Sequence, residues 1–166
     1  FMPDPYFSIV VSAYNRASII RRCVDSCLNQ TFDDFEVVVV DDASTDDTLA
    51  VLQAIADPRL TIVAHVVNKG ICPARHTGMH HARGRWLVAL DSDHGLMPTA
   101  LADLYRRTIN APLDIGAVGS RYRWDTGRIT PAFVPPAVID YKGRIRWADE
   151  EGGSDYLFCA RREIYE

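Results

Sequence analysis

The residues with the clearest chemical potential are Asp91 and Asp93, which flank Ser92 directly after the apolar run 86–90. Two carboxylates at this spacing can face one side of a turn, and their oxygens suit a hard divalent cation such as Mg²⁺ or Mn²⁺. Such an ion keeps positions open for phosphate oxygens and stabilises a departing diphosphate. Alternatively, both aspartates are solvated turn residues, one of which caps the next segment. Because the triplet follows a buried strand, we favour the metal site.

Two other predicted strands, 7–12 and 35–40, also end in residues that could contact a ligand. The residues at these two ends are Ser12, Ala13, Tyr14, Asn15, Asp41 and Asp42. The carboxyl ends of parallel strands meet at one edge of an open sheet, which is where ligands bind in such folds. We therefore expect the three strand ends to converge on one site.

Side chains at these ends could recognise a nucleotide. Asp41 and Asp42 can accept hydrogen bonds from a base imide or a ribose hydroxyl, although N-capping of a helix would explain one of the two. Tyr14 can stack on a nucleobase, and packing against the protein is an equally good explanation for a lone aromatic residue. The predicted ligand therefore combines a base with a diphosphate.

Basic and histidine residues follow in the segment 68–80. Lys69 and Arg75 can contact phosphate or base, or balance the carboxylates. His76 and His80 are four apart on a predicted helix without the glutamate of a zinc-protease motif, so we interpret them as ordinary helix residues. His94, next to the acidic triplet, is a further candidate for contact with the cation or the leaving phosphate.

Apolar runs and helix-like segments alternate through the first 110 residues, which is typical of an α/β protein with a parallel sheet flanked by helices. We expect Ser18 to cap a first helix and Ser44 or Thr45 to cap a second, Pro73 to lie in the first turn of a third, and Pro98 to open a fourth. The expected strands are 7–12, 35–40, 60–67 and 86–90. The helix after Ser18 is expected to end at about residue 30, the helix that contains Pro73 at about residue 82, and the helix after Pro98 at about residue 109.

The sequence changes character after Ile115. Strand-like pieces at 115–122, 137–141 and 156–160 alternate with stretches rich in Pro and Gly. This pattern predicts a mixed or antiparallel extension of the same sheet. Residues 161–166 resemble the start of a helix without a C-terminal cap, so we expect the domain to be truncated at its C-terminus.

Composition excludes several classes of protein. The net charge of −4 argues against a nucleic-acid partner, and no apolar run is long enough for a transmembrane segment. No signal peptide is visible and the four cysteines form no disulfide framework, so a reduced, cytoplasmic setting is expected.

Several short motifs, taken together, resemble the family 2 glycosyltransferases, which have the GT-A fold. The matching segments are SIVVSAYNR at 8–16, QTF at 30–32, FEVVVVDDASTD at 35–46, NKG at 68–70, ARHTG at 74–78, GRW at 84–86 and LDSD at 90–93. Their order and spacing are kept over about the first hundred residues, which makes the resemblance more specific than any single motif.

The resemblance implies a metal-dependent transfer of sugar from a nucleotide-diphospho-sugar, preferably a UDP-sugar, to a hydroxyl of a saccharide or other acceptor, with inversion. Ser12 and Tyr14 would flank the base, and Asp42 would meet the uracil edge or the ribose. Arg75 would lie near the nucleotide and Asp91 near the ribose or donor sugar. Asp93 would hold Mn²⁺ or Mg²⁺ on the diphosphate.

The resemblance also implies one GT-A domain over 1–166, with a nucleotide-binding half at 1–110 and the start of an acceptor-side half at 111–166. The family's catalytic base follows the region that resembles 155–163, so we expect it beyond Glu166. The sequence departs from the family at His76, where Asn is common, and at His94, where an acidic residue is common. Neither histidine inherits a role from the family.

Two other functions are compatible with parts of the sequence. The chain could bind a nucleotide-sugar without turnover. Phosphatases with an aspartyl nucleophile also have an Asp-x-Asp motif after a strand, but their pattern has Thr or Val at the position of Gly95 in this chain. A dinucleotide-dependent oxidoreductase is disfavoured because no G-x-G-x-x-G follows the first strand.

Overall fold

The computed structural model describes residues 3–110 together with the segments 117–120, 122–124, 138–139, 145–146 and 157–162. Its main sheet has the strand order β3-β2-β1-β4-β10-β6. The first four strands are parallel, whereas β10 is antiparallel to both β4 and β6. The predicted parallel sheet with a mixed extension is therefore confirmed. The strand bounds are β1 Phe7–Ala13, β2 Phe35–Asp41, β3 Leu60–Ala64, β4 Trp86–Asp91, β6 Ala117–Ser120 and β10 Leu157–Arg161.

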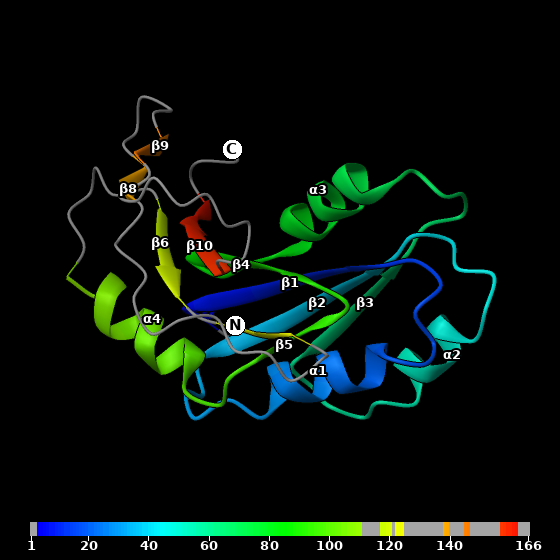
Figure 1. Ribbon diagram of the computed structural model, residues 1–166, viewed down its shortest axis with the longest axis horizontal. Helices are drawn as coiled ribbons and strands as arrows, with labels where there is room; N and C mark the ends of the chain where they lie inside the picture. Colours follow the sequence, from blue (N-terminus) through cyan, green and yellow to red (C-terminus); the bar gives the residue numbers. More distant parts are fainter. Residues whose placement is uncertain are drawn as a thin grey trace.

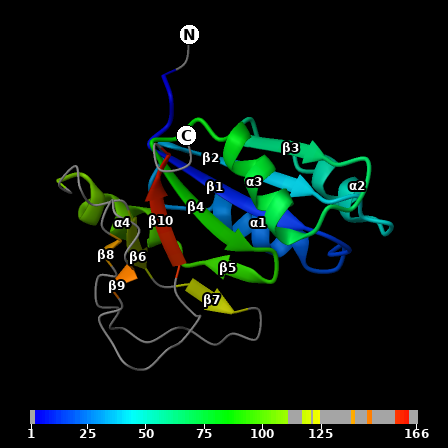
Figure 2. The same cartoon turned by 90° about the horizontal axis from the view of Figure 1, so that it is seen from above.

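Helices cover both faces of this sheet. Helix α3 lies on one face, and α1 and α2 lie on the other (Figure 1). Two small strand pairs, β5 with β7 and β8 with β9, stand apart from the main sheet, on the side of β10 and α4 (Figure 2). The remaining bounds are α1 Ile20–Leu28, α2 Thr48–Gln53, α3 Ile71–His81, α4 Ala100–Thr108, β5 His94–Leu96, β7 Tyr122–Trp124, β8 Val138–Ile139 and β9 Ile145–Arg146.

Strand β1 is buried along its whole length because the sheet is covered on both faces. Ile9 and Val11 belong to the larger core cluster with the buried face of α1, whereas Val10 packs in a second cluster with Ala82 at the end of α3. A Cβ on Gly78 would lie 2.4 Å from Cγ1 of Val10, so the glycine lets α3 approach the sheet closely. The two-sided burial explains why consecutive residues such as Ile9, Val10 and Val11 are all apolar and do not alternate with polar ones.

Several predicted boundaries were wrong by a few residues. Helix α1 begins at Ile20 with Ile19 in the N-cap position instead of Ser18, because the amides of Ile19 and Ile20 both bond to the carbonyl of Arg16 in a preceding turn. Helix α2 begins at Thr48, since Ser44 and Thr45 bond to the loop after β1.

Other boundaries shift as well. Helix α4 starts at Ala100, two residues after Pro98, whereas α3 starts at Ile71 and therefore has Pro73 in its first turn, as expected. Strand β3 ends at Ala64, and α1 ends at Leu28, earlier than expected. Arg161 belongs to strand β10 and does not begin a helix. Residues 163–166, where that helix was expected, lie outside the described part of the chain.

The register of the sheet brings the three polar strand ends together. Ser12 is paired with Asp91 on β4, and Ala13 is paired with Asp41 on β2. The three ends therefore stop at the same level of the sheet, and their predicted convergence is confirmed. Within the described segments, none of the helices combines the length and apolarity that spanning a bilayer requires.

Candidate functional site

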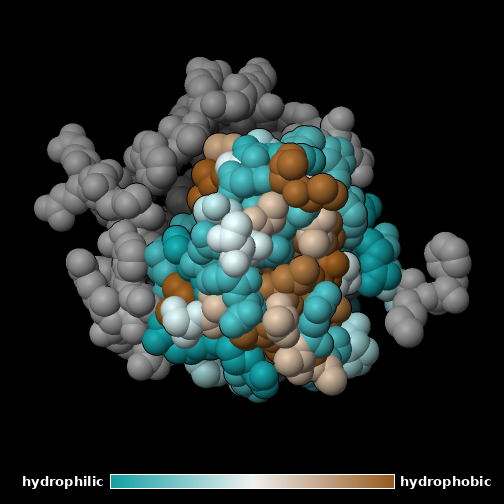
Figure 3. All heavy atoms as spheres, turned by 90° about the vertical axis from the view of Figure 1, so that its right-hand side faces the viewer, coloured by the Kyte–Doolittle hydropathy of each residue, from teal (hydrophilic) through white to brown (hydrophobic). Residues whose placement is uncertain are grey.

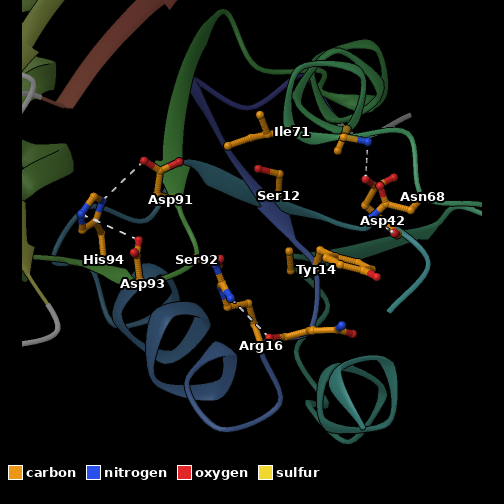
Figure 4. Close-up of a pocket in the computed structure, with 14 residues that line it drawn as sticks. Ser12, Tyr14, Arg16, Asp42, Asn68, Ile71, Asp91, Ser92, Asp93 and His94 are labelled. Atoms are coloured by element: carbon orange, nitrogen blue, oxygen red, sulfur yellow. Dashed lines mark hydrogen bonds and ion pairs between the residues drawn. The ribbon is translucent and has the colours of Figure 1, made fainter. Parts of the chain in front are cut away.

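A pocket opens at the carboxyl ends of β1, β2 and β4 (Figure 4). Its volume of about 740 Å³ lies in the usual range for small-molecule sites. The lining comes from the end of β1 and the loop after it, the loop after β2, the loop between β3 and α3, the start of α3, and the end of β4 with the residues that follow it. The lining residues are Ser12, Ala13, Tyr14, Asn15, Arg16, Asp42, Asn68, Gly70, Ile71, Ala74, Asp91, Ser92, Asp93 and His94.

One end of the pocket carries two carboxylates and an imidazole. His94 Nδ1 lies 3.8 Å from Asp91 Oδ2, and His94 Nε2 lies 3.8 Å from Asp93 Oδ1 (Figure 4). One ligand atom from each of the three residues falls within 4.8 Å of the others. Ligands on opposite sides of an ion that takes oxygen at 2.0–2.1 Å lie about 4.2 Å apart, so small side-chain rotations would bring this set onto one cation. The residues present therefore fit a divalent metal.

Asp91 also has a partner on the opposite side, outside the pocket lining. Its Oδ1 forms an ion pair with Arg75, which α3 carries across from the other face of the sheet. The Arg75 side chain is about two-thirds buried, at 34% exposure. Arg75 therefore orients Asp91 and balances part of the negative charge at this end of the pocket.

Asp42 is held in a different way at the other end of the pocket. Its carboxylate accepts hydrogen bonds from the backbone amides of Lys69 and Gly70, and Asp42 Oδ1 lies 2.6 Å from His65 Nδ1. The other ring nitrogen of His65 lies 3.0 Å from the Thr77 hydroxyl. Burial alone would raise the pKa of Asp42, but the bonds from His65, Lys69 and Gly70 outweigh it and hold the pKa below its usual value. The charged carboxylate therefore fixes the loop 65–70 against the sheet.

Replacing Asp42 by Asn tests this function of the carboxylate. The amide keeps the shape of the side chain but loses the charge and one acceptor, in a position where the side chain is only 4% exposed. We expect the free energy of unfolding to fall by about 1–3 kcal/mol, the range for hydrogen bonds to a buried charged group. Urea unfolding at pH 7 measures this, with Asp47→Asn at the exposed start of α2 as the matched control. An unchanged midpoint for Asp42→Asn would contradict the proposed restraint.

The loops after β1 and β2 are tied to each other. The backbone amides of Asn15, Arg16 and Ala17 donate to the side chains of Ser44, Thr48 and Asp46, respectively. The Asn15 amide oxygen accepts a bond from the backbone of Thr45 in return. Asn15 adopts a left-handed conformation with φ 52°, which asparagine tolerates better than most residues. These bonds position Tyr14 and Arg16 at the mouth of the pocket.

The structure brings most of the predicted site residues into one lining. Those that line the pocket are Ser12, Ala13, Tyr14, Asn15, Asp42, Asp91, Ser92 and Asp93. Three others lie just behind it: Asp41 accepts bonds from Ser44, Lys69 donates its backbone amide to Asp42, and Arg75 pairs with Asp91.

Sequence reasoning missed several residues of the site. Arg16, Ile71 and Ala74 line the pocket, although no motif assigned a role to any of them. His65 was missed as well, because its contact with Asp42 spans 23 residues and no local motif marks it. In the Asn-Lys-Gly turn the sequence indicates the Lys69 side chain as the ligand contact, whereas Asn68 and Gly70 are the residues that line the pocket.

The molecule's surface at this edge is mixed in polarity. Figure 3, which looks onto the carboxyl ends of the parallel strands, shows hydrophobic patches among hydrophilic side chains. Exposed apolar residues at this edge are Tyr14, Val66 and Val67 in the loops and Ile71 at the start of α3. An apolar rim beside a carboxylate-rich end suits a ligand with one aromatic and one anionic part, the latter held through a cation.

The family model described as Glycosyl transferase family 2 matches residues 8–163 of this chain. The succinoglycan biosynthesis protein ExoO of Rhizobium meliloti is 45% identical over 106 residues, covering 64% of this chain and 30% of that protein. Chondroitin synthase of Escherichia coli is 38% identical over 135 residues, covering 72% of this chain and 20% of the synthase. The chain thus spans less than a third of the length of either relative.

Solved structures show the same fold. The mannosyltransferase PcManGT from Pyrobaculum calidifontis, in complex with GDP-Man and Mn²⁺, matches with a TM-score of 0.62 at 31% identity, covering 70% of this chain and 36% of that one. TarS of S. aureus in complex with UDP-GlcNAc matches with a TM-score of 0.58 at 31% identity, covering 63% of this chain and 30% of that one.

Proposed function

This chain belongs to glycosyltransferase family 2, and from that premise we propose that it binds a nucleotide-diphospho-sugar, preferably a UDP-sugar, for transfer to an acceptor hydroxyl with inversion. The observation that carries the proposal is the single pocket lined by Ser12, Asp42, Asp91 and Asp93 at the ends of three neighbouring strands. The pocket has a carboxylate-rich end and a loop-lined end, and its volume suits one small-molecule ligand. The family match also disfavours the phosphatase alternative.

In this proposal Asp91 and Asp93 hold Mn²⁺ or Mg²⁺, with His94 beside them. When bound, such an ion neutralises the negative charge that develops on the leaving diphosphate. Arg75 keeps Asp91 oriented toward the pocket through their ion pair. Support comes from the mutual distances within the Asp91, Asp93 and His94 cluster and from the relative whose complex contains GDP-Man and Mn²⁺.

The nucleoside is proposed to occupy the other end of the pocket. Tyr14, with 43% of its surface exposed, offers a ring face for stacking on the base. Asp42 and the loop 68–70 form the wall against which the base edge or ribose would lie, and Ser12 lies between the two ends. The preference for uridine is supported by the TarS complex with UDP-GlcNAc, whereas PcManGT was solved with GDP-Man.

The acceptor side is proposed to lie with residues 111–166, and the donor side with residues 1–110. Among the described residues that line the pocket, the carboxylates are Asp42, Asp91 and Asp93. Asp42 is bonded to the loop 65–70, and the other two are assigned to the cation. We therefore propose that the base that activates the acceptor hydroxyl comes from outside the described residues.

The test of this function is the release of free nucleotide from a panel of donors with Mn²⁺ and saccharide acceptors. We expect acceptor-dependent release of UDP from at least one UDP-sugar and none of GDP from GDP-mannose. Binding of UDP-sugars without release, in this chain and in a longer one that continues past Glu166, would favour a binding protein over an enzyme. Failure of every nucleotide to bind would overturn the donor site itself.

A further inference from the structure

The outer face of α3 carries an unassigned pair of histidines. His76 and His80 are one helical turn apart and both are exposed. Their Nε2 atoms lie 3.2 Å apart, with ring centroids at 4.3 Å and an interplanar angle of 79°. Helix α3 lies on the face of the sheet opposite to α1 and α2 (Figure 1), and neither histidine belongs to the lining of the donor pocket.

The separation of the two nitrogens is the one expected of a metal chelate. Imidazole nitrogens bind Zn²⁺ at about 2.0–2.1 Å, and two such bonds with nitrogens 3.2 Å apart enclose an angle of about 100–106°. This angle lies between the 90° of a square-planar ion and the 109° of a tetrahedral one. In the structure one ring donates a hydrogen bond to the other across this distance, so an ion bridging His76 and His80 would replace that hydrogen and would require rotation of the rings, but no change in the helix backbone. The same i, i+4 spacing provides the two zinc ligands of the zinc-protease helix.

Nearby groups leave the pair accessible to an ion. Arg75, the adjacent cation, is directed to the opposite side of the helix by its ion pair with Asp91. His81 is oriented differently, because its Nδ1 lies 2.8 Å from the Thr77 carbonyl oxygen. Cys72 is exposed one turn before His76 on the same face, but it does not join the two histidines in a compact three-ligand group.

We propose that His76 and His80 form a second metal site, a bidentate surface chelate for Zn²⁺, Ni²⁺ or Cu²⁺ with solvent completing the coordination. Imidazole suits these borderline ions, whereas the carboxylates of Asp91 and Asp93 suit a hard cation such as Mg²⁺ or Mn²⁺. The two sites thus differ in ligand chemistry, and this proposal does not depend on the donor site. An ion that binds only the folded helix would stabilise the protein against unfolding.

The test is a Zn²⁺ titration, with thermal unfolding and Cu²⁺ electron paramagnetic resonance as further readouts. A Cys72→Ser, Asp93→Asn background removes the thiol and the acidic site as competing ligands. In this background we expect one Zn²⁺ to bind, the melting temperature to rise, and nitrogen couplings to appear in the Cu²⁺ spectrum. His76→Gln or His80→Gln should each weaken Zn²⁺ binding at least about tenfold, since loss of mere outer-shell partners already costs 10–100-fold.

His81→Gln, the neighbouring exposed histidine, is the control and should retain both the Zn²⁺ affinity and the melting shift. Equal Zn²⁺ affinity in the background protein, His76→Gln and His80→Gln would overturn the proposal. A Cu²⁺ spectrum without nitrogen couplings in the background protein would overturn it independently of the unfolding data.

Discussion

Replacing Asp93 by Asn is expected to weaken the binding of Mn²⁺ in the presence of UDP by at least about tenfold. The amide has the size of the carboxylate and should preserve the turn after β4, but it removes one negative charge and one strong oxygen ligand from the proposed cation site. Loss of outer-shell partners of a bound metal already costs 10–100-fold, so loss of a direct ligand should cost no less. The decrease of the free Mn²⁺ electron paramagnetic resonance signal measures this affinity.

Asp103→Asn is the matched control for this substitution. Asp103 lies on α4, where it forms an exposed ion pair with Arg106 away from the pocket. Its replacement should leave Mn²⁺ binding unchanged. If Asp93→Asn binds Mn²⁺ in the presence of UDP as tightly as the unaltered chain, the assignment of the acidic triplet to the diphosphate cation is wrong.

The largest expected loss of stability comes from Glu36→Gln, at the opposite edge of the sheet from the pocket. The Glu36 carboxylate is 6% exposed and accepts bonds from the Ser8 hydroxyl, the Arg83 amide and the Arg83 guanidinium. The Ser8 hydroxyl in turn accepts a bond from the Gly84 amide. One carboxylate therefore links β1, β2 and the segment that enters β4.

A glutamine cannot satisfy all of these donors, because its NH₂ group would face one of them. Removing one partner of a buried ion pair typically costs 3–5 kcal/mol, but the Arg83 side chain is 55% exposed and can be solvated. We therefore expect a loss of about 2–3 kcal/mol in the free energy of unfolding, measured with urea at pH 7. The half-exposed pair of Asp25 and Arg21 provides the control, since Asp25→Asn should cost less than about 1 kcal/mol.

The same carboxylate should make stability depend on pH. Burial would raise the pKa of Glu36, but the bonds from Arg83 and Ser8 outweigh it and lower the pKa. A carboxyl group with a lowered folded-state pKa contributes stability above its unfolded value, and that contribution is lost as the pH falls through the folded-state value. The difference in free energy of unfolding between the unaltered chain and Glu36→Gln should therefore be largest near pH 7. It should decrease as the pH falls below about 4.3, the pKa of an unfolded glutamate. A difference that stays constant down to pH 3 would contradict this.

The sheet and the position of the site could be predicted because local sequence determines both. The valines 37–40 of β2 form a continuous apolar run, as expected of a strand covered on both faces, and polar residues follow directly after them. Parallel pairing then forces the ends of β1, β2 and β4 to one edge. The pairing of Ser12 with Asp91 places two of the predicted site residues side by side at this edge.

The features that sequence reasoning missed depend on contacts between distant segments. No periodicity or motif links His65 to Asp42. Likewise, the sequence does not indicate why Glu36 lies in an apolar run, because its partner Arg83 is far away in the chain. The helix starts were misplaced for the same reason. Ser44 resembles an N-cap, yet its side chain bonds to the loop after β1, which sequence alone does not bring close.

The most direct measurement is the affinity of the unaltered chain for UDP, determined by calorimetry in Mn²⁺ and again with the metal removed by EDTA. If Asp91 and Asp93 hold the cation that binds the diphosphate, UDP should bind at least about tenfold more tightly in Mn²⁺, while uridine should show no such dependence. Equal affinity for UDP with and without Mn²⁺ would contradict a metal-dependent nucleotide-sugar site at the carboxyl ends of these strands.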